Sequence, residues 1–104
     1  MSYIKLTGAN FDECVKEGVC LVDFYATWCG PCRALSPVIE ELAGDFAGRA
    51  KIAKVDVDEE RELASRFGVV SIPTLLFFKD GKLKEQIAGT HSKNTLTKKL
   101  NELL

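Results

Sequence analysis

The stretch that decides the fold is Cys20-Leu21-Val22-Asp23-Phe24-Tyr25-Ala26-Thr27-Trp28-Cys29-Gly30-Pro31-Cys32. The apolar run at 20–26 predicts a buried strand. Pro31 favours a helix start, because its φ is fixed near the helical value and it lacks an N–H that the first turn would leave unpaired. Two thiols three positions apart at such a junction can form a disulfide and exchange two electrons. A CxxC alone also occurs in zinc knuckles, whereas strand, Trp, CGPC and helix in this order indicate a redox centre.

The size and composition are those of one globular domain, which we expect to span residues 1–104. Fourteen basic residues nearly balance fifteen acidic ones, so the net charge does not indicate nucleic acid as a partner.

There is no run of about 18 apolar residues that could cross a membrane, and residues 1–5 lack the apolar core of a secretory signal. We therefore expect a cytoplasmic protein, where structural disulfides are rare and four cysteines indicate metal binding or redox chemistry.

Hydrophobic spacing predicts alternating strands and helices along the rest of the chain. We expect a strand at 3–5, a helix from Phe11 capped by Asn10 with Glu13, the strand at 20–26, and a helix from Pro31 to near Gly48 that Pro37 bends. There follow a strand at 52–57, a short helix capped by Asp58 and ended by Gly68, strands at 74–78 and 83–88 joined by Asp80-Gly81, and a helix capped by Ser92. The predicted fold class is α/β, with a central mixed sheet of five strands flanked by four helices.

Several motifs accompany the CGPC sequence: Val22-Asp23-Phe24, Pro37, Lys54-Val55-Asp56-Val57-Asp58, Ile72-Pro73-Thr74, Phe78-Lys79-Asp80-Gly81 and Gly89. In this order and spacing they resemble the thioredoxin family over essentially the whole chain, and the resemblance implies the thioredoxin fold. Tyr25, Thr27 and Arg33 stand where the family often has Trp, an acid and Lys. Cys14 and Cys20 are additional to the commonest family pattern, and we interpret them as small buried hydrophobic residues.

The two cysteines of the motif are expected to have different roles. Cys29 lies at the predicted helix N-terminus, where free amides and the macrodipole favour a thiolate, so we expect it to be the attacking thiol. Cys32 lies one turn further in and is expected to be the shielded, resolving thiol. The alternative of an inert structural disulfide is weaker, because so short a loop gains little stability from closure.

Two charged residues interrupt otherwise apolar strands. Burial of Asp23 would raise its pKa and make it a proton acceptor near neutral pH, although the same residue could instead face water at an edge. Lys54 alone would more often be a surface residue whose stem lies along apolar neighbours. The family resemblance places Lys54 beside the buried Asp23, where their titrations would be coupled.

The family resemblance also implies a substrate surface around Cys29. Ile72-Pro73-Thr74 is similar to the family's cis-proline loop, which faces the dithiol, although most X–Pro bonds are trans. Trp28, Gly30, Pro31, Ile72, Pro73 and Gly89 would then form a flat, partly apolar surface for an extended protein segment. From the sequence alone, Trp28 is as consistent with core packing as with substrate contact.

The function that the resemblance implies is reduction of protein disulfides through Cys29 and Cys32, with recycling by a flavin-dependent thioredoxin reductase. No bound cofactor or metal is expected, and we expect a monomer that binds neither nucleic acid nor membrane. The Gly30-Pro31 pair matches reducing members of the family, because oxidising members usually carry a His there.

Two other classes of function were weighed. A structural zinc site could use all four cysteines, but the seven residues at 20–26 form a predicted strand between them and the spacing is not that of a usual zinc knuckle. A non-catalytic binding subunit is compatible with the same fold. Loss of activity on removing both cysteines of the motif would exclude the second alternative.

Overall fold

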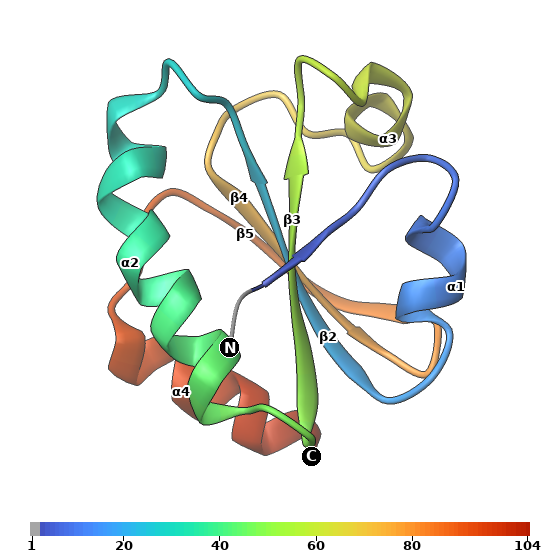
Figure 1. Ribbon diagram of the computed structural model, residues 1–104, viewed down its shortest axis with the longest axis vertical. Helices are drawn as coiled ribbons and strands as arrows, with labels where there is room; N and C mark the ends of the chain where they lie inside the picture. The colour runs from blue at the N-terminus through green and yellow to red at the C-terminus, as the bar shows by residue number, and fades with distance from the viewer. Residues whose placement is uncertain (1–2) are drawn as a thin grey trace.

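A central mixed sheet organises the chain (Figure 1), for which a computed structural model describes residues 3–104. Within these residues the strands are β1 (Ile4–Lys5), β2 (Val19–Tyr25), β3 (Ala50–Asp56), β4 (Thr74–Lys79) and β5 (Lys82–Ala88). The helices are α1 (Phe11–Val15), α2 (Gly30–Asp45), α3 (Arg61–Arg66) and α4 (Lys93–Leu103). In this described part of the chain, no helix is long and apolar enough to cross a membrane.

The strands lie side by side in the order β1-β3-β2-β4-β5. β3 pairs in parallel with β1 and β2, whereas β4 runs antiparallel to both β2 and β5. β2 is therefore the central strand, and all but its last residue are buried. The predicted five-stranded mixed sheet with four helices is confirmed.

Helices cover the sheet on both faces, with α2 and α4 on one side and α1 and α3 on the other (Figure 1). Side chains alternate along each strand, so Val19 and Leu21 of β2 pack under α2 and α4, while Val22 and Phe24 pack toward α1 and α3. Asp23 belongs to the same alternate set as Leu21. Its side chain therefore points toward the α2 layer, where the cysteine motif begins.

Capping explains where the two longer helices start. Ser92 precedes α4, and its Oγ accepts a hydrogen bond from the Thr95 N–H at 3.1 Å, as predicted. Cys29 occupies the equivalent position before α2, and Pro31 lies in the first turn of that helix. Pro37 lies inside α2, and a bend at this residue stays a prediction.

Two capping predictions are wrong. The Asn10 side chain does not cap α1; its Oδ1 accepts from the Thr7 N–H at 2.7 Å and closes the preceding turn. Asp58 does not cap α3 either. This helix begins at Arg61, three residues after Asp58, and has no side-chain cap. Short polar side chains satisfy turns as readily as helix ends, so their spacing alone does not distinguish the two.

Strand and helix ends differ from the predictions by one to three residues. The strands predicted at 20–26 and 52–57 are Val19–Tyr25 and Ala50–Asp56, and the first strand begins at Ile4 rather than at residue 3. The helix predicted to end near Gly48 ends at Asp45. Backbone hydrogen bonds set these limits, to neighbouring strands for the strands and within the helix for α2, and the hydrophobic pattern does not record them.

Candidate active site

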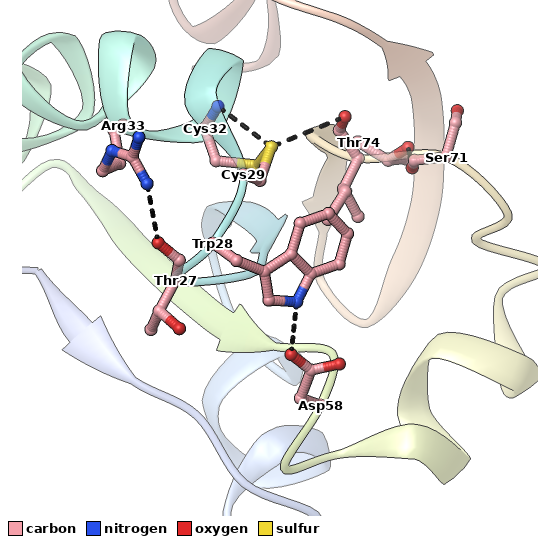
Figure 2. The surroundings of a disulfide bond; sticks show 9 residues. Thr27, Trp28, Cys29, Cys32, Arg33, Asp58, Ser71 and Thr74 are labelled. Carbon is pink, nitrogen blue, oxygen red and sulfur yellow. Dashed lines mark hydrogen bonds between the residues drawn. A yellow bond between two sulfur atoms is a disulfide. The ribbon is translucent and has the colours of Figure 1, made fainter.

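The redox pair is assembled where β2 ends and α2 begins (Figure 2). Cys29 and Cys32 form a disulfide, with their Cα atoms 5.2 Å apart. The N–H of Cys32 donates to Cys29 Sγ at 3.2 Å, so the sulfur takes the place of an oxygen cap on the helix. Both residues are nearly buried, at 5% and 3% exposure, so the expected difference in shielding is small.

The helix that follows explains the electrostatics of Cys29. α2 is 16 residues long, and the N–H of Cys32 in its first turn donates to the Cys29 sulfur. Because this amide and the helix dipole favour negative charge, they stabilise a thiolate at Cys29 once the disulfide is reduced. The guanidinium of Arg33 donates to the Thr27 carbonyl at 3.1 Å, which ties the first turn of α2 to the loop before it (Figure 2).

The loop that faces the disulfide contains a cis peptide bond between Ile72 and Pro73. Cys29 Sγ lies 3.9 Å from the carbonyl oxygen of Ile72. Thr74 Oγ1 donates to the Ser71 carbonyl at 2.6 Å, and the Gly89 N–H donates to the Pro73 carbonyl at 2.8 Å. The predicted cis bond and its position beside Cys29 are therefore confirmed, and Gly89 is linked to the same loop.

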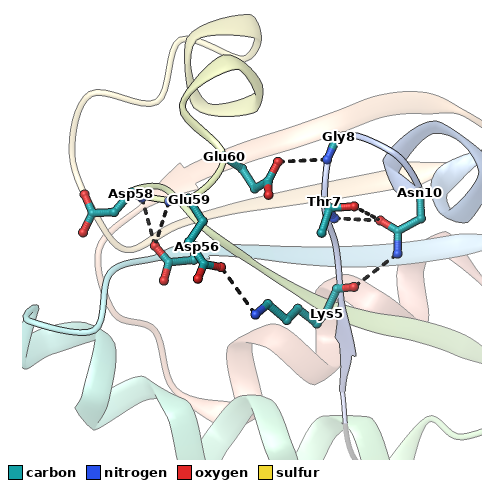
Figure 3. A network of polar contacts seen from close by, with 8 residues as sticks. All are labelled: Lys5, Thr7, Gly8, Asn10, Asp56, Asp58, Glu59 and Glu60. Carbon is teal, nitrogen blue, oxygen red and sulfur yellow. Dashed lines mark hydrogen bonds and ion pairs between the residues drawn. The ribbon is translucent and has the colours of Figure 1, made fainter.

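Trp28 lies on the surface beside the disulfide rather than in the core. Its side chain is 67% exposed, and its Nε1–H donates to Asp58 Oδ2 at 2.8 Å (Figure 2). Asp56 Oδ1 accepts from the N–H groups of Asp58 and Glu59 at 2.9 and 3.4 Å, which shapes the turn that carries Asp58 (Figure 3). Asp58 was missed as a site residue, although it follows a strand parallel to β2 and so lies at the same edge of the sheet.

The other residues predicted for the substrate surface also lie around the disulfide. Gly30 and Pro31 are exposed in the first turn of α2, and Ile72 is half-buried against Cys29 and Cys32. Pro73 itself is buried, whereas Ser71 before Ile72 is exposed. Nearby Val70 is 97% exposed and was not predicted, because a single valine in a loop carries no pattern.

Asp23 is completely buried, and neither of its carboxyl oxygens has a hydrogen-bond partner among the described residues. Burial raises the pKa of this carboxyl to about 7, and the positive charge of Lys54 partly opposes the rise. The alternative of an edge carboxylate in water is thereby excluded. A buried acid with this pKa can gain or lose a proton near neutral pH.

Lys54 is also buried, at 6% exposure, and it lies opposite Asp23 in the register of β2 and β3. Its ammonium donates to Ser36 Oγ at 3.2 Å and lies over the rings of Tyr3 and Tyr25. The surface interpretation of Lys54 is therefore wrong. Ser36 and Tyr3 were not predicted, because they come from α2 and from the segment before β1 and meet Lys54 only in the folded chain.

The remaining cysteines are far from this arrangement in the fold. Cys20 packs in the core on the α1 and α3 face, with Cys14 against it, whereas Cys29 and Cys32 pack with Ala26. In residues 3–104 there is no group of three or more His, Cys, Asp or Glu side chains placed to hold a metal ion. The four cysteines therefore do not converge on a zinc site.

A disulfide at a helix start, opposite a cis-proline loop on a mixed sheet, defines a dithiol–disulfide oxidoreductase. Comparison with known proteins agrees with this class. A family model described as Thioredoxin matches residues 2–102. Thioredoxins from Staphylococcus haemolyticus and Staphylococcus aureus are 51% and 49% identical, each over the full length of both chains.

Solved structures give the same result. The structure of a mutant thioredoxin from Halobacterium salinarum matches with a TM-score of 0.91 and 38% identity, covering 98% of this chain and 90% of that one. The chain belongs to the thioredoxin family. It is a protein-disulfide reductase whose redox-active pair is Cys29 and Cys32, and membership implies protein disulfides as substrates and a reductase as a partner.

Proposed function

We propose that Cys29 is the thiol that attacks substrate disulfides and that Cys32 is the thiol that resolves the product. The hydrogen bond from the Cys32 N–H to Cys29 Sγ carries this assignment. An amide that donates to a sulfur stabilises its thiolate, and the thiolate is the nucleophile in disulfide exchange. Cys32 lies within the first turn of α2, and its sulfur is within bonding reach of Cys29.

The proposed reaction has two exchange steps. The Cys29 thiolate attacks one sulfur of the substrate disulfide, forming a mixed disulfide and releasing the other substrate sulfur as a thiolate. Cys32 then loses its proton and attacks Cys29 Sγ, so the second substrate sulfur leaves as a thiolate and the Cys29–Cys32 disulfide forms. The substrate gains two electrons from the protein, and both of its thiolates take up protons.

Asp23 is proposed to accept the proton of Cys32 in the second step. Its pKa of about 7 and its place under α2 support this role. Lys54 would stabilise the carboxylate form of Asp23 before the transfer. A cavity of about 230 Å³ lined by Cys32, Ser36 and Lys54 among others lies beside the Cys32 and Lys54 side chains.

The substrate is proposed to bind as an extended segment over Trp28, Gly30, Pro31, Ile72, Pro73 and Gly89. The backbone of Ile72 beside Cys29 supports pairing by strand addition, and the exposed Trp28 ring supports apolar contact. We propose further that this single domain acts as a cytoplasmic monomer without a bound cofactor, and that a flavin-dependent thioredoxin reductase returns two electrons to its disulfide.

The test is to trap the mixed disulfide. Cys32→Ser should attack insulin once and accumulate a covalent adduct through Cys29, because the resolving thiol is missing. The matched variant Cys29→Ser should give no adduct under the same conditions. Non-reducing mass spectrometry of both reactions identifies the linked cysteine. An adduct through Cys32 in Cys29→Ser, with none in Cys32→Ser, would reverse the assignment.

A further inference from the structure

Asp23 and Lys54 are opposite charges on neighbouring strands that do not form an ion pair. They are direct partners in the β2–β3 register, so their side chains lie on the same face of the sheet. Even so, both Asp23 oxygens lack a partner, and no ion pair joins the two residues among those described. A buried ammonium is costly unless it has partners. Because Asp23 does not pair with Lys54, other groups must hold the Lys54 ammonium.

Three groups from separate parts of the chain hold the Lys54 ammonium. Lys54 Nζ lies 4.3 Å from the centroid of the Tyr25 ring and 4.8 Å from that of the Tyr3 ring. It also donates to Ser36 Oγ at 3.2 Å. An ammonium over two ring faces is attracted by both, and more strongly where water is excluded. These contacts occupy the Lys54 ammonium, which forms no ion pair with Asp23 among the described residues.

We propose that Tyr25 and Tyr3 are positioning residues, which hold the Lys54 ammonium out of contact with the Asp23 carboxyl and so keep Asp23 able to accept the proton of Cys32. The inference rests on the proposed role of Asp23 as proton acceptor. An ammonium in contact would stabilise the carboxylate far more than one at a distance, because the attraction between charges falls with their separation. Asp23 would then ionise at lower pH and become a weaker base.

Among the groups around Asp23, Lys54 is the cation that lowers the pKa of its carboxyl. The charged or titratable side chains around Lys54 and Tyr25 include Asp56 on β3, Glu59 after it, Cys32 and Arg33 on α2, and Tyr3 before β1. The neighbouring residue on β4 is the apolar Leu75, and α4 contributes Leu96 and Leu100. The guanidinium of Arg33 is bound to the Thr27 carbonyl.

The chemistry of Tyr25 suits a fixed neutral ring. Burial raises the pKa of its hydroxyl, and the negative charge of Asp56 raises it further. Tyr25 therefore stays protonated throughout the pH range in which Asp23 titrates. Its ring face, rather than its hydroxyl, contacts the ammonium. Phenylalanine should therefore replace it in this role, whereas an aliphatic side chain should not.

The test is a carboxyl carbon NMR titration of Asp23 in the oxidised protein, which needs no turnover. Tyr25→Leu should lower the pKa of Asp23 by about one unit or more, the scale of a close opposite charge. Tyr25→Phe should leave it unchanged. Tyr25→Leu could also admit water to Asp23. The titration is therefore repeated in the Lys54→Met background with and without Tyr25→Leu, where the leucine substitution should no longer change the pKa of Asp23. Tyr3→Leu, at the more distant ring, should act in the same direction and serves if Tyr25→Leu does not fold.

The outcomes separate this inference from the function on which it rests. An unchanged Asp23 pKa in both leucine variants overturns the positioning role, and so does an equal fall in the presence and absence of Lys54. The pH profile of insulin reduction should move with the Asp23 pKa. If the pKa falls but the profile does not follow, the positioning role stands and the proton-acceptor role of Asp23 is wrong.

Discussion

Cys29 and Cys32 lie at the start of α2, whereas Cys14 and Cys20 lie on α1 and β2 at the other face of the sheet. Exposure does not distinguish the redox pair from the other two cysteines, because Cys14 is half-buried and Cys29 is only 5% exposed. Thiolate stability does not separate them either. A hydrogen bond from Cys20 lowers the pKa of the Cys14 thiol, burial opposes this, and the charge of Lys51 adds to the lowering.

What separates the two pairs is their position relative to helices and loops. Cys29 caps a 16-residue helix and lies beside the Ile72 carbonyl, where an extended substrate can pair. Cys14 lies near the end of a five-residue helix, and Cys20 is completely buried in β2. A redox site therefore needs a docking surface and a second thiol within reach, in addition to a stabilised thiolate.

The largest expected difference is between two variants in which one cysteine of each pair is replaced by serine. Cys29→Ser should abolish reduction of insulin by the protein with its reductase, because no nucleophile remains at the start of α2. Cys14→Ser should keep the parent rate, because Cys14 has no part in either exchange step. Insulin turbidity and reductant consumption measure both. Residual turnover in Cys29→Ser, or its loss in Cys14→Ser, would break the contrast between the pairs.

The second effect concerns the buried carboxyl that lies beneath only the first pair. The folded pKa of Asp23, about 7, exceeds its ordinary value of 3.8. The native protein therefore holds this proton more tightly, and stability from the neutral form is complete below about pH 4 and is lost as pH rises toward 7. The loss relative to Asp23→Asn should reach roughly 4 kcal/mol at 1.36 kcal/mol per pKa unit.

Urea unfolding of the oxidised parent and of Asp23→Asn at pH 4, 5.5 and 8 measures this difference. We expect the asparagine variant to gain on the parent across this range, with most of the gain below pH 7. A constant difference between the two proteins would show that Asp23 titrates in the folded state as it does in the unfolded chain.

A smaller effect is expected at the surface beside the first pair. Trp28→Ala removes an exposed ring and its bond to Asp58 without touching either sulfur. Apparent KM for a protein disulfide should rise about fivefold to thirtyfold, corresponding to about 1–2 kcal/mol of lost contact. The rate with a small-molecule disulfide should change much less. An equal loss for both substrates would mean that Trp28 supports the loop structure rather than the substrate.

The smallest effect sharpens the description of the second pair. In the oxidised protein, Cys29 and Cys32 are joined, so iodoacetamide should modify Cys14 ahead of the buried Cys20. Cys20→Ala removes the hydrogen bond that stabilises the Cys14 thiolate and should slow its modification at pH 7 by up to about tenfold. Mass spectrometry at timed intervals measures the rate. Faster or equal modification in Cys20→Ala would contradict the hydrogen-bonded pair.

Much of the fold and the redox pair could be predicted from the sequence, because both depend on local pattern. The apolar run at 20–26, Pro31 and the Asp80-Gly81 turn each act within a few residues, and the elements they predicted are present. The capping roles of Asn10 and Asp58 were wrong for the same reason, since each side chain found a partner that local spacing did not indicate. The family resemblance, rather than the pattern, supplied the cis bond at Pro73.

The sequence by itself determined that a dithiol lies between a buried strand and a helix, because strand, proline and cysteines are contiguous. Only the tertiary structure decided that Trp28 is exposed, that Asp23 is buried without a partner, and that Lys54 turns toward Tyr3 and Tyr25. These features depend on burial and on contacts between β1, β2, β3 and α2, which are distant in the chain. Burial sets the pKa of Asp23, and burial exists only once these elements have packed together.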